Sequence, residues 1–203
     1  MSSTLADILT RHFPKSAYSA LEELINSFKF SFKVTPDRAT KLGDFRVRQG
    51  HTAAITVNGS LNPYAFLITF LHELAHLAVY EQYGRHHKPH GYEWKSQFQQ
   101  YLLLTIKHSL FPDELLGEIL LFTNNPKAST AASPALMKAL ATFDKKSTTE
   151  YPLYLDDIII GKTFIFRNQL YKKIEKRRTR VLCERVIDQR RYTIPGHAEV
   201  INP

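Results

Sequence analysis

Residues 61–84 read LNPYAFLITFLHELAHLAVYEQYG, and the rest of the chain is organised around this stretch. The pattern predicts one long helix, because Asn62 can cap its N-terminus, Pro63 suits the first helical position and Gly84 can end it. Apolar side chains fall all round the helical cylinder, which is typical of a helix inside a fold. This interior helix nevertheless carries two imidazoles and a carboxylate within HELAH, residues 72–76.

The spacing of the two histidines predicts a metal site. His72 and His76 are four residues apart, so they lie on one face of the helix and can bind one Zn²⁺ at about 2.0–2.1 Å each. Glu73 points about 100° away from His72, too far for a comfortable ligand but near enough to take a proton from a water held there. The alternative is two core histidines and a surface glutamate, but three buried titratable groups are costly without a compensating partner.

A catalytic zinc needs a third protein ligand and one open position. The helix continues for about 12 Å beyond His76, and the loop of residues 85–90 can span about 20 Å, so His90 can return to the metal. Glu93 is the other contender, since a carboxylate also serves in such sites and these two residues share one helical side. We favour His90, and we expect Trp94 to pack its helix against the first one.

The hydrophobic periodicity predicts an α+β first part followed by a strand-rich last part. In the first part we expect helices at residues 4–12, 17–28, 92–108, 113–122 and 135–143, and strands at 28–34, 43–49 and 52–57. The polar stretch 144–152 marks a boundary. Beyond it we expect a small twisted sheet or barrel with strands at residues 157–160, 162–167, 170–175, 179–186 and 191–194.

Composition narrows the class of protein. The single cysteine, Cys183, excludes an internal disulfide framework and a Cys-rich zinc ribbon, and its apolar strand predicts a buried thiol. The N-terminus lacks the apolar run of a signal peptide, and the HELAH residues interrupt the longest apolar stretch, so we expect no membrane span. A protein of a reducing compartment is expected, with the cytoplasm as the default.

The basic excess lies mainly near the C-terminus. The net charge is +8, and residues 145–203 carry 13 Lys and Arg against 7 Asp and Glu. Such a cluster can bind the phosphates of DNA or RNA. The alternative is a solvated strand face whose aromatic residues build a small core. The candidate nucleic-acid contacts are Lys172, Lys173, Arg177, Arg178 and Arg180.

Two motifs taken together carry a family resemblance. HELAH, followed fourteen residues after its last histidine by HGYEWK at residues 90–95, resembles the SprT-like family of zinc metalloproteases, which includes the Spartan DNA–protein crosslink proteases. The resemblance covers residues 28–101. Many SprT-like proteins carry a Cys-based zinc ribbon after the protease domain, whereas this chain has a basic, strand-rich tail in that place.

The resemblance implies a zincin-like α+β metalloprotease domain, in which a small sheet packs on helices. It implies Zn²⁺ as the cofactor and assigns four residues, His72, His76 and His90 as ligands and Glu73 as the catalytic base. We therefore expect a SprT-like domain over residues 1–145, with its core at 28–122, and a small basic β-rich module over 151–203.

The leading hypothesis is a zinc-dependent endopeptidase that acts on protein substrates held near nucleic acid. Zincin-like proteases commonly pair extended substrate with an edge strand, and residues 52–57 are our candidate for that strand. The second hypothesis is a nucleic-acid-binding protein whose zinc is chiefly structural. A fourth protein ligand would favour the second hypothesis, because it would close the site to a reactive water.

Overall fold

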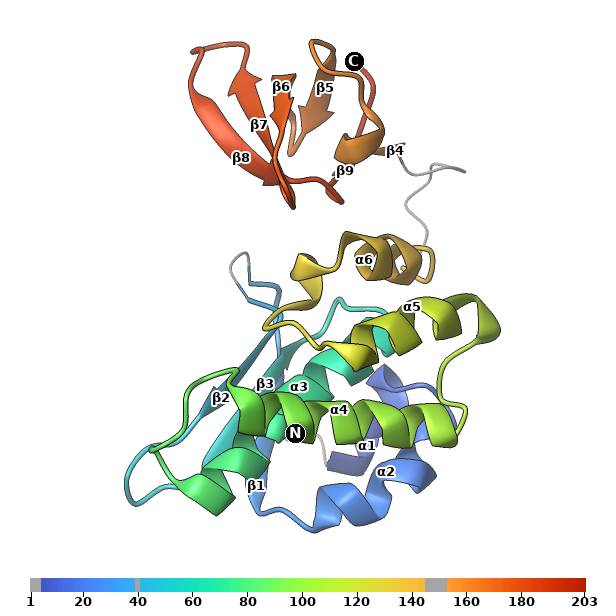
Figure 1. The fold of residues 1–203 in the computed structure, drawn as a ribbon, viewed down its shortest axis with the longest axis vertical. Helices are drawn as coiled ribbons and strands as arrows, with labels where there is room; N and C mark the ends of the chain where they lie inside the picture. The colour runs from blue at the N-terminus through green and yellow to red at the C-terminus, as the bar shows by residue number, and fades with distance from the viewer. Residues whose placement is uncertain (1–4, 39–40, 145–152) are drawn as a thin grey trace. The chain divides into compact units, whose positions relative to one another are not determined.

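The computed structural model describes residues 5–38, 41–144 and 153–203. The chain divides into two compact units, residues 1–128 with 139–144 and residues 129–138 with 145–203. The ribbon in Figure 1 shows helices and small sheets, and the predicted mixed α+β class is confirmed. The predicted domain boundary between residues 145 and 151 lies outside the described residues.

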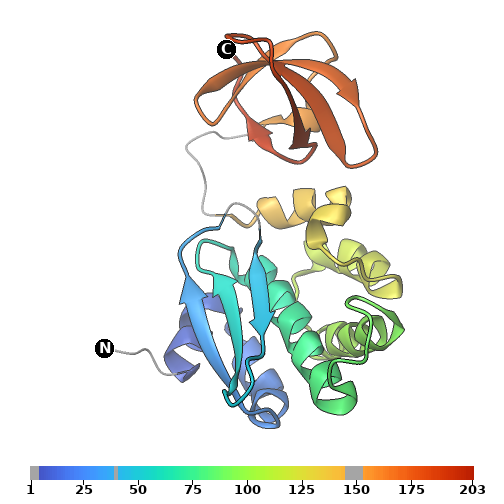
Figure 2. The ribbon, with the colours of Figure 1, turned by 90° about the vertical axis from the view of Figure 1, so that its left-hand side faces the viewer.

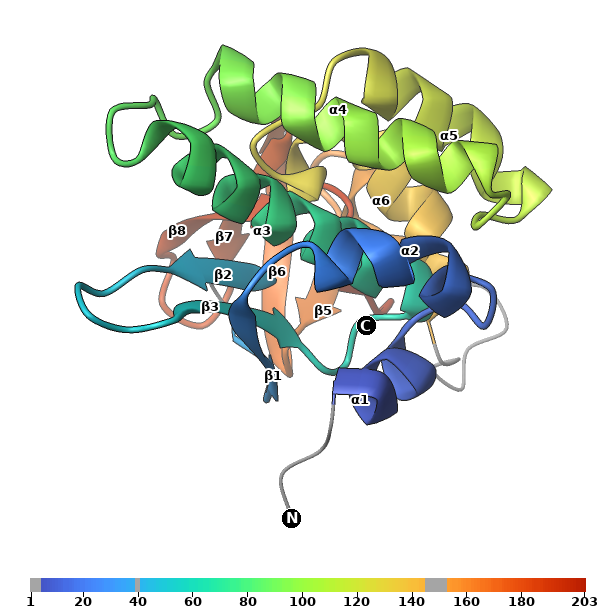
Figure 3. The same cartoon turned by 90° about the horizontal axis from the view of Figure 1, so that it is seen from below.

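The first unit holds a three-stranded sheet and most of the helices. Its described elements are α1 (Leu5–His12), α2 (Ala17–Asn26), β1 (Phe30–Thr35), β2 (Gly43–Arg46), β3 (Ala53–Asn58), α3 (Pro63–Tyr83), α4 (Tyr92–Lys107), α5 (Asp113–Asn124) and the end of α6 (Pro134–Ala141). The strand order is β1-β3-β2, with β1 parallel and β2 antiparallel to β3. Figure 3 shows α3 between this sheet and α4.

The strand predicted as the free edge is the central strand, so that prediction is wrong. Ile55 of β3 lies opposite Phe32 of β1 on one side and Phe45 of β2 on the other. Ile55 and Val57 are fully buried, as expected for a strand with neighbours on both sides. The strand order leaves β2 at an edge of the described sheet.

The boundaries of α3 are set by the residues predicted to set them. The Asn62 side-chain oxygen accepts hydrogen bonds from the backbone N–H groups of Tyr64 and Ala65 at 3.1 and 3.0 Å. Gly84 follows the helix with a φ of 65°, which a side chain would resist. In the described part of the chain, no helix combines the length and the apolar character needed to cross a membrane.

Aromatic rings hold α3 against the sheet. Phe70 lies 5.1 Å from Phe32 and 6.2 Å from Phe30, measured between ring centroids, and Phe13 packs edge-on to Phe66 and Phe70. Phe66 and Phe70 are fully buried. These contacts fix the rotation of α3, and therefore decide which helical residues face β2 and which face α4.

The second unit has its own hydrophobic core. Its described elements are η1 (Thr130–Ala132), the start of α6, β4 (Leu153–Tyr154), η2 (Leu155–Asp157), β5 (Thr163–Phe166), β6 (Gln169–Lys176), β7 (Arg180–Arg185), β8 (Arg191–Pro195) and β9 (Glu199–Val200). Strands β5 to β8 form an antiparallel sheet in chain order, seen in orange and red in Figure 2. The core residues are Leu155, Ile158, Phe164, Tyr171, Val181, Cys183, Ile194 and Val200, which confirms the buried thiol.

No strand forms at residues 157–160, where one was predicted, and the short 3₁₀ turn η2 ends at Asp157. The apolar run Ile158–Ile160 indicated a strand, yet Ile159 and Ile160 are exposed. The Lys173 ammonium donates hydrogen bonds to the backbone oxygens of Leu155, Asp156 and Ile158, at 2.9, 3.2 and 2.6 Å. A side chain from β6 therefore satisfies carbonyl groups that a neighbouring strand would otherwise bind.

Candidate metal centre

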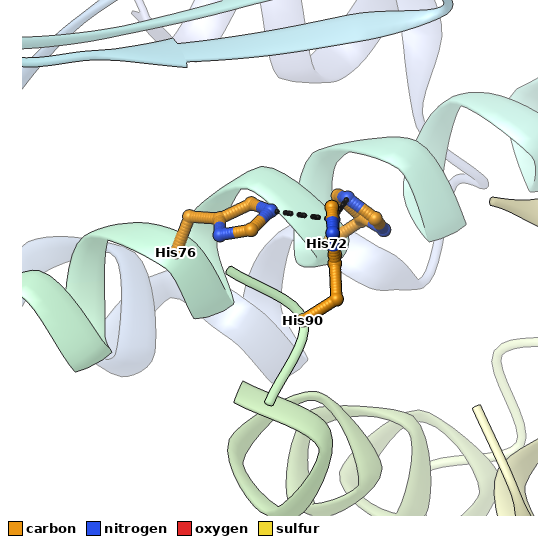
Figure 4. A group of neighbouring side chains, drawn as sticks. All are labelled: His72, His76 and His90. Atoms are coloured by element: carbon orange, nitrogen blue, oxygen red, sulfur yellow. Dashed lines mark hydrogen bonds between the residues drawn. The ribbon is translucent and has the colours of Figure 1, made fainter. Parts of the chain in front are cut away.

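Three imidazole rings converge beside α3. The Nε2 atoms of His76 and His90 are 3.0 Å apart, and those of His90 and His72 are 3.2 Å apart. Figure 4 shows the two α3 histidines and His90, which comes from the loop before α4, turned toward one another. One ligand atom from each of the three histidines lies within 4.8 Å of the others. The structure thus brings together the three residues predicted as ligands.

The donor set fits a metal ion better than a hydrogen-bonded cluster. A neutral imidazole nitrogen either donates one proton or accepts through one lone pair, so His90 Nε2 cannot form good hydrogen bonds to both neighbours. Three imidazole nitrogens can instead share one cation. Tetrahedral zinc with bonds of about 2.0–2.1 Å places its ligand nitrogens about 3.3 Å apart, close to the 3.0 and 3.2 Å observed here.

Burial keeps the histidines neutral, which is the form that binds a metal. Burial lowers the pKa of His72 to about 2, and the neighbouring histidines act in the same direction. It lowers the pKa of His76 to about 4, where His90 and His87 add to the effect. The pKa of His90 is also lowered by burial.

The backbone conformation of the loop before α4 positions His90 beside His72 and His76. His90 has a φ of 56°, a conformation that few non-glycine residues adopt. The next residue, Gly91, donates its N–H to the Lys88 carbonyl at 2.8 Å, and a Cβ at position 91 would meet that oxygen at 2.8 Å. Glu93, the alternative ligand, is not part of the three-histidine group among the described residues.

Trp94 supports all three histidines from the first turn of α4. Its ring centroid lies 4.6 Å from that of His72, 5.3 Å from that of His76 and 4.7 Å from that of His90. The indole N–H donates to the His72 carbonyl at 3.3 Å, and Trp94 is fully buried. The expected packing role of Trp94 is confirmed, and that packing also orients the imidazole rings.

Glu73 lies on the side of α3 that faces β2. The pKa of Glu73 is raised to about 8, first by burial and then by the Asp44 carboxylate. Arg38, Lys41 and the Phe45 backbone N–H, which donates to the Glu73 carboxyl, act in the opposite direction. A cation held by the histidines would lower this pKa, because an opposite charge favours the carboxylate.

Two β2 residues at the site were missed by the sequence reasoning. Gly43 lies against the Glu73 side chain, and a Cβ there would be 2.5 Å from Glu73 Oε1. The Phe45 ring stacks on His76 with 6.2 Å between centroids. A glycine inside a strand pattern is itself a signal, because it often marks the close approach of another group.

The five basic residues predicted to contact nucleic acid lie in the second unit and differ in exposure. Lys172, Arg177, Arg178 and Arg180 are exposed. The prediction is wrong for Lys173, which is 3 % exposed and whose ammonium is bound by three carbonyl oxygens. The cause is strand alternation, because Lys173 shares the inward face of β6 with the buried Tyr171.

The fold and the site define a class of protein, an α+β domain whose candidate metal centre combines two histidines of an HExxH helix with a third from the loop that follows it. Residues 10–108 match the model of the SprT-like family, which confirms the predicted resemblance. Searches among curated proteins and among solved structures gave no match. The matched segment contains the sheet, α3 and α4, and therefore every residue of the candidate centre.

Proposed function

We propose that this protein is a zinc-dependent endopeptidase of SprT-like type. The observation that most directly supports this proposal is the convergence of three neutral imidazole nitrogens, at hydrogen-bonding distances from one another. They lie beside the helix α3, which also carries the buried Glu73. His72, His76 and His90 would hold the zinc ion. A bound zinc ion supplies a Lewis acid that polarises a carbonyl and makes water more acidic.

Glu73 carries the proton transfers in this proposal. Its carboxylate accepts a proton from the attacking water and returns it to the nitrogen of the leaving amine. Burial and the Asp44 carboxylate raise the pKa of Glu73 to about 8, against the opposing effect of Arg38, Lys41 and the Phe45 N–H. A cation held by the histidines would favour the ionised carboxylate, which is the form that accepts the proton. The enclosed position of Glu73, only 7 % exposed, limits exchange of that proton with bulk water.

The ligand count favours a catalytic over a structural metal. Within residues 5–38, 41–144 and 153–203, the group contains three histidines and no fourth His, Cys, Asp or Glu. Three protein ligands leave one coordination position for water or substrate, whereas structural zinc sites are usually closed by four. This supports the enzyme over a nucleic-acid-binding protein with chiefly structural zinc.

The edge strand beside the site is β2, which takes the role first expected of residues 52–57. It pairs with β3 on one side and lies at the edge of the described sheet. An extended peptide can add to such an edge through backbone hydrogen bonds. The Phe45 contact with His76 puts this edge next to the candidate centre, so part of the proposal is that protein substrates bind along β2.

Nucleic acid is a second proposed partner, through the second unit. The supporting observation is that Arg177, Arg178 and Arg180 lie exposed at or near the turn between β6 and β7, with Lys172 exposed on β6. Arginine side chains at such a turn can contact phosphates without base specificity. The proposal also includes a reducing compartment, the cytoplasm, in keeping with the single buried thiol of Cys183.

A Glu73→Gln variant tests the enzyme proposal. Purified wild-type protein should contain about one zinc per chain by elemental analysis and should cleave an unfolded protein substrate. The variant should keep the zinc and lose the cleavage, since glutamine has the same shape but cannot accept the proton. Cleavage that persists in the variant would exclude Glu73 as the base, and protein without zinc would exclude the metal centre.

A further inference from the structure

The first residue of β2 is in unusually close contact with the proposed base. A Cβ at Gly43 would lie 2.5 Å from Oε1 of Glu73, 2.8 Å from its Cγ and 2.8 Å from Cγ2 of Thr69. Real Cβ atoms essentially never approach other heavy atoms this closely. The Glu73 side chain can therefore occupy its observed position only because residue 43 has no side chain.

The neighbours of Gly43 cannot easily move aside. Thr69 is 6 % exposed, and its hydroxyl donates to the Ala65 carbonyl at 2.8 Å, which holds the β-branched side chain in one rotamer. Glu73 is equally enclosed, and the Phe45 N–H binds its carboxyl. Of these neighbours, only the carboxylate at the far end of the flexible Glu73 side chain can move, so a methyl group added at position 43 would displace it.

The strand itself is held in register from its other side. Gly43 pairs with Val57 and Phe45 pairs with Ile55, both on the central strand β3. A slip of one residue would turn the Asp44 side chain toward α3, because alternate residues face opposite sides of a sheet. The strand pairing therefore places both Gly43 and the N–H group of Phe45 against the carboxyl group of Glu73.

We propose that Gly43 is a positioning residue for Glu73. It acts through the shape of the space in which the carboxyl group lies and touches neither metal nor substrate. The inference rests on the proposed function, in which Glu73 is the base. Any side chain at position 43 shifts the carboxylate from its place while leaving the three histidines where they are.

Gly43→Ala is the test, with Gly117→Ala as the matched control. Gly117 lies within α5, and a Cβ there meets no atom within 4 Å. In Gly43→Ala we expect zinc content equal to wild type, an unchanged KM and a kcat lower by about 100-fold, the cost of misplacing a reacting group by about 1 Å. Adding Thr69→Ser, which removes one of the clashing carbons, should restore part of the kcat.

A readout that does not depend on activity is the coupling between Gly43 and Glu73 in unfolding. Gly43→Ala should lower the denaturant midpoint of the full-length protein as purified, and this loss should shrink in a Glu73→Ala background, which removes Cγ and Oε1. If the effects of Gly43→Ala and Glu73→Ala on the denaturant midpoint are additive, the two residues are not in contact. If Gly43→Ala loses zinc, or changes only KM, Gly43 is not a positioning residue for Glu73. A wild-type protein without peptidase activity would refute the proposed function, while the unfolding cycle would still decide the contact.

Discussion

Replacing Lys173 by methionine should destabilise the second unit and leave the first unit unaffected. The Lys173 ammonium donates to three carbonyl oxygens, and its bonds to Leu155 and Ile158 are fully buried. Methionine keeps the length of the side chain but removes this donor from all three oxygens, of which the Leu155 oxygen still accepts the Ile158 backbone N–H at 3.3 Å. Each buried unsatisfied carbonyl costs about 1–3 kcal/mol, while the variant no longer buries a charge, so we expect a net loss of about 3 kcal/mol.

The assay must observe the second unit separately. The single tryptophan, Trp94, belongs to the first unit and does not report on the strands of the second. Hydrogen exchange of the β6 and β7 backbone amides reports on the second unit. A loss of about 3 kcal/mol in the stability of that unit makes these amides exchange on the order of 100-fold faster, because they exchange when the unit opens. Lys172→Met is the matched control, because Lys172 is the exposed neighbour on the other face of β6.

Two outcomes would refute the reasoning about Lys173. Exchange in Lys173→Met that matches exchange in Lys172→Met would mean that the three hydrogen bonds contribute little net stability. Weaker nucleic-acid binding in Lys173→Met, with unchanged exchange, would return this residue to the basic surface on which the sequence first placed it.

Two further predictions concern the metal and the basic turn. His90→Ala should lose most of its zinc on dialysis against a weak chelator, because only two histidine ligands remain. The control His86→Ala, which changes an exposed residue outside the three-histidine group, should retain its zinc. Equal retention of zinc by the two variants would exclude His90 as a ligand. Changing Arg177, Arg178 and Arg180 to Glu should abolish a low-salt shift with DNA and flatten its salt dependence; binding that is unchanged by these substitutions would place the nucleic-acid contact elsewhere.

Much of the site was predictable because its signals are local. The boundaries of α3 follow from Asn62, Pro63 and Gly84, whose side chains or backbone act within a few residues of themselves. The spacing of His72 and His76 places both on one helical face for the same reason. The placement of His90 was a wider inference, based on the reach of the loop, and the structure brings its ring to the other two.

Contacts between distant segments decided what the sequence left open. Strand pairing puts residues 53–58 in the middle of the sheet and β2 at its edge, since pairing order depends on the whole fold and not on the pattern within one strand. The close approach of β2 to α3 gives Gly43 its role beside Glu73. Lys173 was predicted on the basic surface although strand alternation puts it on the face of Tyr171, and only the tertiary structure supplied the three carbonyl oxygens that make a buried ammonium stable there.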